Sequence, residues 1–393
     1  MHFKTLKDAG VRGNRVLLRE DFNVPMKDGT IADETRITAA LPTLRFLHEH
    51  GAKTVILSHL GRPEGKPNPK FSLRPIAARL SQLLGTPVTF VDDCVGDGAV
   101  AASKALRDGG FALFENVRFH PGEEANDADF ARELAMSGDL YVNDAFGAAH
   151  RAHASTVGVA TDLPSYAGLL MEAELNALGR LTGNPVHPYV CAIGGAKIVD
   201  KVGVFENLVA KVDAFVVGGG MANTFLAAHG IDVGTSLRDP DLAPAKRIIA
   251  LAAEKNVTLH LPVDAVVANA FDADHTARIS ALKDVGEGMI LDIGPQTAHA
   301  YAAVLRKAKT IVFNGPMGVY EKHAYQNGTR IVCQAIAEAT AHGATSVVGG
   351  GDAAAAAHAL GFASAMTHIS TGGGATLEFL EGKTLPGVAA LER

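Results

Sequence analysis

Cysteine is scarce in this sequence, and tryptophan is absent. The chain of 393 residues has three cysteines, Cys94, Cys191 and Cys333, which lie far apart in the sequence. An odd number of widely spaced cysteines does not make a disulfide framework, and neither a zinc-site nor an EF-hand spacing occurs. We therefore expect three reduced thiols, as is usual in the cytoplasm, and no metal site built on cysteine spacing.

The sequence also lacks an excess of basic residues and a long apolar run. Its formal net charge is −6 at pH 7, which argues against nucleic acid or an anionic membrane as the partner but is compatible with a local cationic cleft. No stretch reaches the roughly 18 uncharged apolar residues of a membrane span, and residues 1–8 contain no apolar signal core. We expect a cytoplasmic protein that acts on small molecules, with phosphorylated compounds among the candidates.

What is present is typical of a soluble α/β protein with two domains. The chain is 47% hydrophobic and 20% charged, and it is too long for one ordinary core. Short apolar segments alternate with helical patterns, which predicts βαβ units and mainly parallel sheets. The expected strands are 16–18, 55–57, 88–91, 112–114 and 140–142 in the first half, and 189–193, 214–217, 258–261, 289–291, 310–313 and 345–348 in the second.

A helix is expected between the two series of strands. Residues 171–178 are good helix formers, and Gly183, Asn184 and Pro185 end the pattern. We therefore predict a first domain at residues 1–170, with the connecting helix at the start of the second.

Two runs of three glycines, residues 349–351 and 372–374, each follow an apolar segment and precede a helix-like stretch. Glycine lets the backbone come close to a ligand, and the first N–H groups of a helix attract anions. One such turn is equally typical of a strand that simply ends. Two of them favour a polyphosphate ligand.

Arginines follow several strands of the first half, at the edge where open α/β sheets bind ligands. One arginine in such a place is usually a surface ion pair, for example between Arg36 and Asp33. Several together, with His59 beside them, predict a cationic pocket for phosphate or carboxylate, whereas His153 is interpreted as structural. The arginines are Arg36, Arg62, Arg118 and Arg151.

In the second half, Lys197 and Lys201 follow a strand and lead into a helical pattern. They are four residues apart, so they share a face if both stand at the helix start, where two ammonium groups favour a negative ligand. Two solvated lysines beside Asp200 are the alternative. Glycines at positions 218–220, 294 and 315 follow other strands and suit a flat base and ribose.

Two common nucleotide motifs are excluded. Residues 218–220 follow a strand, but a dinucleotide fingerprint needs glycine or alanine where Asn223 stands. Gly382, Lys383 and Thr384 resemble the end of a P-loop, but Leu377 occupies the position of its first glycine. The first mismatch argues against a dinucleotide-dependent dehydrogenase.

The ordered motifs of this chain resemble phosphoglycerate kinase from end to end. The resemblance rests on both glycine runs and on residues 19–25, 58–63, 143–153, 194–201 and 314–321. It implies two similar-sized three-layer α/β/α domains with mainly parallel sheets, joined by a helix, in a monomeric, hinge-bending kinase. The nucleotide-binding domain is implied to span residues 171–374, and a tail of about residues 375–393 is implied to complete the first domain.

The resemblance also implies roles for individual residues. The 3-phosphoglycerate substrate is assigned to Asp21, Phe22, Asn23, Arg36, His59, Leu60, Gly61, Arg62, Arg118 and Arg151. ADP or ATP is assigned to Gly194, Gly195, Lys201, Gly218, Asn314, Pro316, Glu321, Gly350, Gly351, Asp352 and Ala353, with Asp352 also reaching Mg²⁺. The phosphoryl group in transit is assigned to Arg36, Lys197, Lys201, Gly350 and Gly373. Ala353 departs from the threonine that the family commonly has, which removes a hydroxyl contact to phosphate.

The implied reaction is the reversible transfer of the acyl phosphate of 1,3-bisphosphoglycerate to ADP, giving 3-phosphoglycerate and ATP in glycolysis or gluconeogenesis. Such a transfer depends on positioning and charge neutralisation, without a covalent enzyme intermediate, and on closure of the domains to exclude water. A non-catalytic nucleotide-binding protein with the same fold is the main alternative. The intact basic and glycine motifs argue against it.

Overall fold

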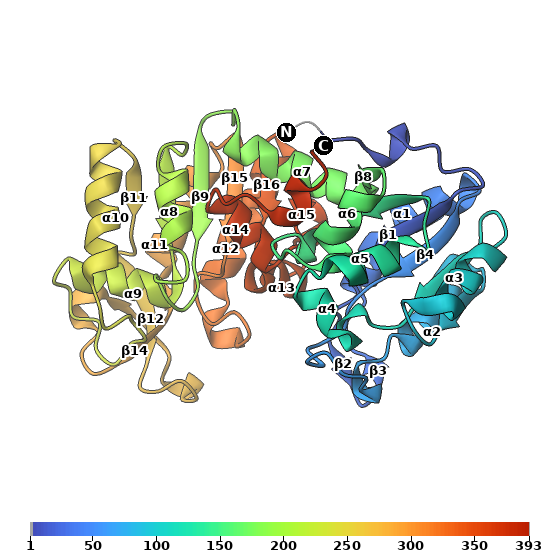
Figure 1. Ribbon diagram of the computed structural model, residues 1–393. Coiled ribbons are helices and arrows are strands. Elements are labelled where there is room, and N and C mark those ends of the chain that lie inside the picture. The colour runs from blue at the N-terminus through green and yellow to red at the C-terminus, as the bar shows by residue number, and fades with distance from the viewer. Residues whose placement is uncertain (1–2, 393) are drawn as a thin grey trace. The chain divides into compact units, whose positions relative to one another are not determined.

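The computed structural model describes residues 3–392 and divides the chain into two compact units (Figure 1). One unit runs to Asn176 and takes in the chain again from Thr384, and the other spans Ala177–Lys383. The boundary lies inside helix α7 (Leu169–Thr182), in the segment where the sequence predicts a connecting helix. Over the described residues, no helix is both long and apolar enough to cross a membrane.

The first unit is built on a six-stranded sheet in the order β5-β6-β4-β1-β7-β8, and all its strand pairs are parallel. Its strands are β1 (Arg15–Arg19), β4 (Lys53–Leu57), β5 (Val88–Val91), β6 (Phe111–Phe114), β7 (Leu140–Asn143) and β8 (Ser165–Ala167), beside a small antiparallel ribbon of β2 (Met26–Lys27) and β3 (Thr30–Ile31). Its helices besides α7 are α1 (Thr35–Glu49), α2 (Arg74–Leu84), α3 (Gly96–Ala105), α4 (Pro121–Glu124), α5 (Ala128–Ala135), α6 (Val159–Asp162) and α15 (Pro386–Ala389). Short helical turns are η1 (Leu6–Asp8), η2 (Pro69–Phe71), η3 (Val117–Phe119), η4 (Phe146–Ala148) and η5 (Ala154–Gly158).

Helices cover both faces of this sheet because successive strand residues point to opposite sides. Leu18 of β1 packs in a core with Leu44 of α1 and Ile76 of α2. Its neighbour Leu17 packs in a second core with Leu134 of α5. The sequence therefore reads as an almost continuous apolar run in β1, and the unit has the expected three layers.

The second unit repeats this arrangement with a parallel sheet in the order β11-β10-β9-β15-β16-β17. Its strands are β9 (Tyr189–Ile193), β10 (Ala214–Val217), β11 (Thr258–His260), β15 (Thr310–Asn314), β16 (Thr345–Val348) and β17 (His368–Ile369). Its helices are α8 (Val202–Leu208), α9 (Gly219–Ala228), α10 (Ala243–Glu254), α11 (Pro295–Leu305), α12 (Asn327–Ala341), α13 (Gly351–Ala359) and α14 (Gly374–Leu380), with short turns η6 (Asp274–Thr276), η7 (Leu282–Asp284), η8 (His323–Tyr325) and η9 (Ala363–Ala365).

One expected strand of the second series belongs to a different sheet. Residues 289–291 lie in β14 (Met289–Ile293), which pairs antiparallel with β12 (Asp264–Ala268) rather than joining the parallel sheet. With β13 (Arg278–Ala281) these strands form a separate three-stranded sheet, drawn in yellow and orange beside α9 (Figure 1). A short apolar run predicts a strand but carries no information on its partner.

Parallel registers gather the strand ends of each unit at one edge. In the first unit Arg19 of β1 lies opposite Leu57 of β4 and Asn143 of β7. In the second, Ile193 of β9 lies opposite Asn314 of β15. The polar and glycine residues that follow these strands are thereby brought together.

Candidate functional site

His59 is the centre of a group of positive charges in the first unit. The side chain follows β4 and is 4% exposed. Burial, and then the charges of the surrounding arginines, hold the pKa of His59 well below its ordinary value. These arginines are Arg19, Arg118, Arg151 and Arg36, and with His59 we call them the basic cluster.

Because its pKa is lowered, His59 is neutral at pH 7, and only one of its two ring nitrogens can donate a hydrogen bond. Its Nδ1 lies 3.1 Å from Nη2 of Arg19, which is a donor, so Nδ1 accepts. In a neutral imidazole the other nitrogen, Nε2, then carries the proton. His59 is therefore a hydrogen-bond donor placed among cations, as suits an anionic ligand.

Arg36 is anchored by oxygen atoms of the segment that follows β1. Its Nη1 donates to Oδ1 of Asp21 at 3.2 Å and to the carbonyl of Asn23 at 2.9 Å. The Oδ1 of Asn23 in turn accepts the N–H of Gly61 at 2.9 Å. The sequence offers Asp33 as a partner for Arg36, whereas the structure gives it Asp21, which lies at the sheet edge.

Position 61 can be occupied only by glycine without strain. Its φ is +64°, and a Cβ there would lie 2.3 Å from the ring of Phe71. Its carbonyl accepts a 2.8 Å hydrogen bond from Nη1 of Arg118. Phe22 and Leu60 are buried, and their side chains pack in the core of the first unit.

The remaining predicted arginines differ in environment. Burial, and then the charge of Arg151, lower the pKa of Arg118 to about 10. Arg151 is half-buried, and its Nε contacts Nε2 of His150 at 3.2 Å. Arg62 is exposed, and within residues 3–392 it makes no hydrogen bond or ion pair.

His153 is buried beneath the cluster, in keeping with a structural residue. Burial lowers its pKa to about 4. The backbone N–H of His153 donates to Oγ1 of Thr156 at 3.1 Å, which fixes the start of η5.

Arg19 is a cluster residue that the sequence analysis did not assign to the site. Its guanidinium is completely buried and donates to Oγ of Ser155 at 2.7 Å, to the Glu20 carbonyl and to His59. The Oγ of Ser155 in turn donates to Oε1 of Glu123 at 2.6 Å, so a buried acidic side chain lies close to Arg19. Arg19 ends a strand pattern, and nothing in its sequence context distinguishes it from an exposed arginine.

A buried pair of acids lies on the other side of β1. The carboxyl groups of Glu20 and Asp144 are both buried, and burial raises the pKa of Glu20 and raises that of Asp144 to about 6. Asp144 Oδ1 accepts the N–H of Met171 in α7 at 3.0 Å. Asp144 therefore connects the end of β7 to the start of α7.

A cavity of about 560 Å³ opens at the corresponding edge of the second unit. Its wall is largely apolar, with polar groups at a few points, which is typical of a small-molecule pocket. Of the predicted nucleotide residues, Gly195, Pro316, Glu321 and Asp352 line it. Gly218 precedes two lining glycines, and the apolar wall includes Leu226, Leu237, Phe271, Leu291 and Val319.

Lys201 lies beneath the glycine segments at this edge. Its Nζ donates to the carbonyl of Gly194 at 2.9 Å and to that of Asn314 at 2.6 Å. Burial lowers the pKa of Lys201 to about 8, and the charge of Asp352 partly opposes the shift. The ammonium is thus held near the cavity by neutral acceptors, with its charge uncompensated by a close carboxylate.

Lys197 and Lys201 do not share a helix face. Helix α8 begins at Val202, and the residues from Gly194 to Lys201 form a loop. Lys197 is exposed in that loop, whereas Lys201 is turned inward. Glycines end the strand pattern here, and the sequence does not reveal that the helix starts after both lysines.

Both glycine runs form the expected strand, turn and helix start. Gly350 precedes α13 with a φ of +95°, and Gly373 precedes α14 with a φ of +53°. Asn314 donates to the carbonyl of Gly349 at 2.7 Å, which links the first run to β15. A Cβ on Gly194 would lie 1.9 Å from the carbonyl oxygen of Pro316. Only glycine therefore allows the backbones of these two residues to approach so closely.

Asp352 stands in the first turn of α13, and its exposed carboxylate lines the cavity. Carboxylate oxygen is a preferred ligand of Mg²⁺. Its neighbour Ala353 is buried, so that position packs against the core. The N–H groups at the start of α13 stay available whatever side chain stands at 353.

Comparisons with known proteins place this chain among close relatives. A family model described as phosphoglycerate kinase matches residues 6–383. The chain is 54% identical over 397 residues to a phosphoglycerate kinase of Chloroflexus aurantiacus, covering 100% of this chain and 99% of the relative. It is 53% identical to one of Moorella thermoacetica, with 98% of each covered. A solved structure of phosphoglycerate kinase from Coxiella burnetii is similar with a TM-score of 0.91 and 44% identity, over 99% of each chain.

Proposed function

The chain belongs to the phosphoglycerate kinase family, and on that basis we propose how its own residues carry out the family's reaction. It is a kinase of glycolysis that transfers the acyl phosphate of 1,3-bisphosphoglycerate to ADP, reversibly, giving 3-phosphoglycerate and ATP. The observation that carries the assignment of residues is the presence of two complementary surfaces, one on each unit: the basic cluster, and the cavity with its glycine turns.

The basic cluster binds 3-phosphoglycerate in this proposal. A ligand with one phosphate and one carboxylate needs several hydrogen-bond donors. The planar guanidinium of arginine can donate two parallel hydrogen bonds to either group. The neutral His59 donates from Nε2, while Asp21 and Asn23 keep Arg36 in place. The full set proposed is Asp21, Phe22, Asn23, Arg36, His59, Leu60, Gly61, Arg62, Arg118 and Arg151.

The cavity of the second unit binds ADP or ATP. Its apolar wall accepts the base, and the start of α13 presents free N–H groups and a positive dipole end to the phosphates. The set proposed is Gly194, Gly195, Lys201, Gly218, Asn314, Pro316, Glu321, Gly350, Gly351, Asp352 and Ala353. Mg²⁺ fits this set because Asp352 offers an exposed carboxylate at the cavity wall, and when bound it neutralises phosphate charge.

Phosphoryl transfer then depends on positioning and charge. The acceptor and donor oxygens lie in line with the moving group, so no nucleophilic side chain takes part. We assign charge stabilisation to Arg36, Lys197 and Lys201 and to the backbone N–H groups at Gly350 and Gly373. The exposed Lys197 is free to reach a ligand, whereas Lys201 is already held at the cavity.

The two surfaces belong to separate compact units, and direct transfer requires their ligands to meet. We propose that closure of the units brings this about and excludes water from the acyl phosphate. We also propose that the protein is a monomer and that it is cytoplasmic, the latter because its cysteines are free.

A coupled assay tests the proposal directly. The purified chain is given 3-phosphoglycerate and Mg-ATP, and the product is consumed by a dehydrogenase that oxidises NADH. We expect NADH oxidation that requires the purified chain, 3-phosphoglycerate and Mg-ATP, and that disappears when a chelator removes Mg²⁺. Nucleotide binding without turnover would instead support a non-catalytic nucleotide-binding protein.

A further inference from the structure

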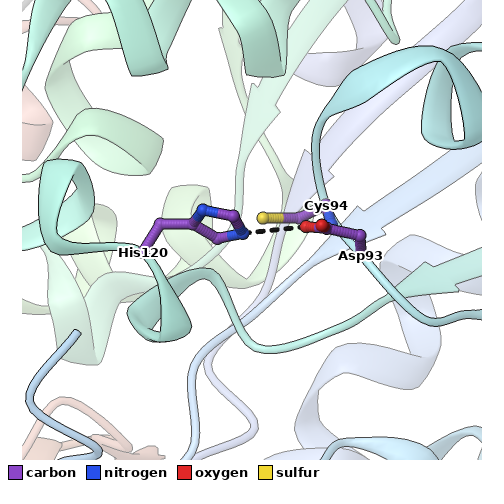
Figure 2. Close-up of side chains that lie close together, drawn as sticks. All are labelled: Asp93, Cys94 and His120. Carbon is purple, nitrogen blue, oxygen red and sulfur yellow. Dashed lines mark hydrogen bonds and ion pairs between the residues drawn. The ribbon is translucent and has the colours of Figure 1, made fainter. Parts of the chain in front are cut away.

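A cluster of potential metal ligands lies in the first unit, outside the basic cluster. Asp93 and Cys94 stand between β5 and α3, and His120 follows η3. One ligand atom from each of the three residues lies within 4.8 Å of the others. Figure 2 shows the imidazole of His120 pointing toward the carboxylate of Asp93 and the sulfur of Cys94.

The three side chains are held in this arrangement by their neighbours. His120 Nε2 lies 2.8 Å from Oδ1 of Asp93, and the imidazole stacks on Phe130 with ring centroids 5.0 Å apart. The backbone N–H of Cys94 donates to the same Asp93 oxygen at 2.7 Å. The Asp93 side chain is 57% exposed, so its carboxylate has room to rotate and to offer either oxygen to a ligand.

A cavity of about 540 Å³, with both apolar and polar side chains in its wall, borders this cluster. Asp93 and His120 line it, together with Asn68, Ser72 and Glu115. The thiol of Cys94 lies behind them, and the carboxylates of Asp93, Glu123 and Glu115 are near enough to add to the effect of burial in raising its pKa. Three carboxylates, of Asp92, Asp93 and Glu115, line the cavity, and its one lining arginine, Arg74, is paired with Asp92. A dication that enters therefore meets a net negative charge, and water has room to fill a remaining ligand position.

We propose that Asp93, Cys94 and His120 form a binding site for a thiophilic divalent cation, best matched by Zn²⁺. Thiolate, imidazole and carboxylate are the three ligand types that Zn²⁺ takes in proteins, at about 2.0–2.3 Å, whereas Mg²⁺ prefers oxygen alone. The ligand atoms need a small inward movement to reach such distances. Binding replaces the hydrogen bond between Asp93 and His120, whose proton moves through water from Nε2 to Nδ1 of the same neutral ring, and it releases the thiol proton to solvent.

The sequence gives no sign of this site. Asp93 and Cys94 are adjacent, and His120 is far along the chain, so no known zinc spacing appears. The parallel sheet brings them together, because β5 pairs with β6 and both strands end at the same edge. The proposed site is separate from Asp352, which belongs to the second unit.

Titration of the full-length, metal-free chain with Co²⁺ in the absence of nucleotide tests the proposal. Co²⁺ replaces Zn²⁺ in such sites, and its thiolate complexes absorb in the near ultraviolet. We expect one equivalent of Co²⁺ to produce this band and one equivalent of Zn²⁺ to remove it. A large excess of Mg²⁺ is expected to leave the band unchanged.

Variants identify the ligands. We expect Cys94→Ser to abolish the band, and Asp93→Asn and His120→Asn each to weaken Co²⁺ affinity more than about tenfold, since even residues that only orient a metal ligand cost about 10–100-fold. Cys191→Ser and Cys333→Ser are matched controls, because both thiols are buried but neither has such neighbours within the described chain. Both controls are expected to keep the band.

Three results would overturn the proposal: no stoichiometric thiolate band in the parent, a band that survives in Cys94→Ser, or unchanged affinity in both other variants. Cys94 lies in the core, so its variant is compared with the parent by circular dichroism. If it does not fold, the exposed Asp93 and half-exposed His120 still decide the question. Turnover with Mg-ATP is measured separately, so the outcome does not depend on the kinase activity.

Discussion

Arg36 is oriented before any substrate arrives, because Asp21 and the Asn23 carbonyl hold its guanidinium. In Arg36→Met the aliphatic stem remains and the planar charge is lost. An arginine that stabilises transferring phosphate is worth about 10³–10⁵ in turnover. We therefore expect kcat to fall by at least about two to three orders of magnitude in the coupled assay, with a smaller change in nucleotide affinity.

Two variants complete this experiment. Arg36→Lys is expected to recover little activity, because an ammonium does not reproduce bidentate geometry. Arg45→Met is the control, since Arg45 is an exposed arginine on the same helix, α1. A folded Arg36→Met protein that turns over within about tenfold of the parent would contradict the catalytic assignment.

Lys201 carries a prediction about pH. Burial lowers its pKa to about 8, so the ammonium is charged below that pH and neutral above it. We expect Mg-ADP affinity, measured by calorimetry without glycerate substrate, to fall as pH rises from 7 to 9, at most about tenfold per pH unit for one proton. Lys201→Met should bind nucleotide more weakly, with no such slope, and 3-phosphoglycerate should bind as before. Parallel slopes in parent and variant would exclude Lys201 as the titrating group.

Residue identity alone did not separate buried from exposed charges. Arg36, Arg118 and Arg151 were predicted from their places after strands, and the structure gathers them around His59. Arg19 and Glu123 were not assigned to the site, although both are buried there. Their positions depend on packing between segments distant in sequence, which one sequence does not contain.

At the scale of elements, the glycine turn before α13 has a conformation that other residues avoid. Gly350 has a φ of +95°, and an added Cβ would lie 3.2 Å from Nδ2 of Asn314. We expect Gly350→Ala to cost about 1–3 kcal/mol of stability. We also expect it to weaken Mg-ADP binding by about tenfold or more, because in the proposed site the turn presents its N–H groups to phosphate. Binding and chemical unfolding are measured on the same protein.

Gly361→Ala is the matched control for this turn. Gly361 also has a positive φ, +81°, but its surroundings are open. We expect a similar loss of stability with Mg-ADP affinity unchanged. Equal affinity losses in the two variants would mean that strain, and not the place of Gly350 close to the cavity-lining Asp352, weakens binding.

The elements were more predictable than their pairing. Alternating apolar segments and turns predicted most strands of the two parallel sheets, since burial on both faces demands such runs, but not the short edge strand β8. They did not predict β12 and β13, nor that β14 pairs with β12. Strand β13 is largely exposed and begins with Arg278, so its apolar signal is weak. Strand β12 is mostly buried and apolar, and it was missed despite that run.

At the scale of the whole molecule, the proposed reaction requires movement of the two units. In the proposal each ligand alone binds to one unit, and transfer requires the two ligands to meet. We expect the radius of gyration in solution scattering to decrease only when 3-phosphoglycerate and Mg-ADP are present together. Equal radii for the apo, the two binary and the ternary states would remove closure from the mechanism, without affecting the assignment of ligands to units.

The segment from Thr384 onward belongs to the first unit, although the whole second unit precedes it in the chain. Gly387 donates to the Ala149 carbonyl at 2.8 Å, and Ala390 packs in the core beside Leu17. On a ribosome that adds about 5–20 residues per second, residues 177–383 take about 10–40 s to make. During that time the first unit has left the exit tunnel without its final segment. The part of the protein that is made first is therefore the part that is finished last, and a nascent chain stalled before Thr384 leaves this unit incomplete.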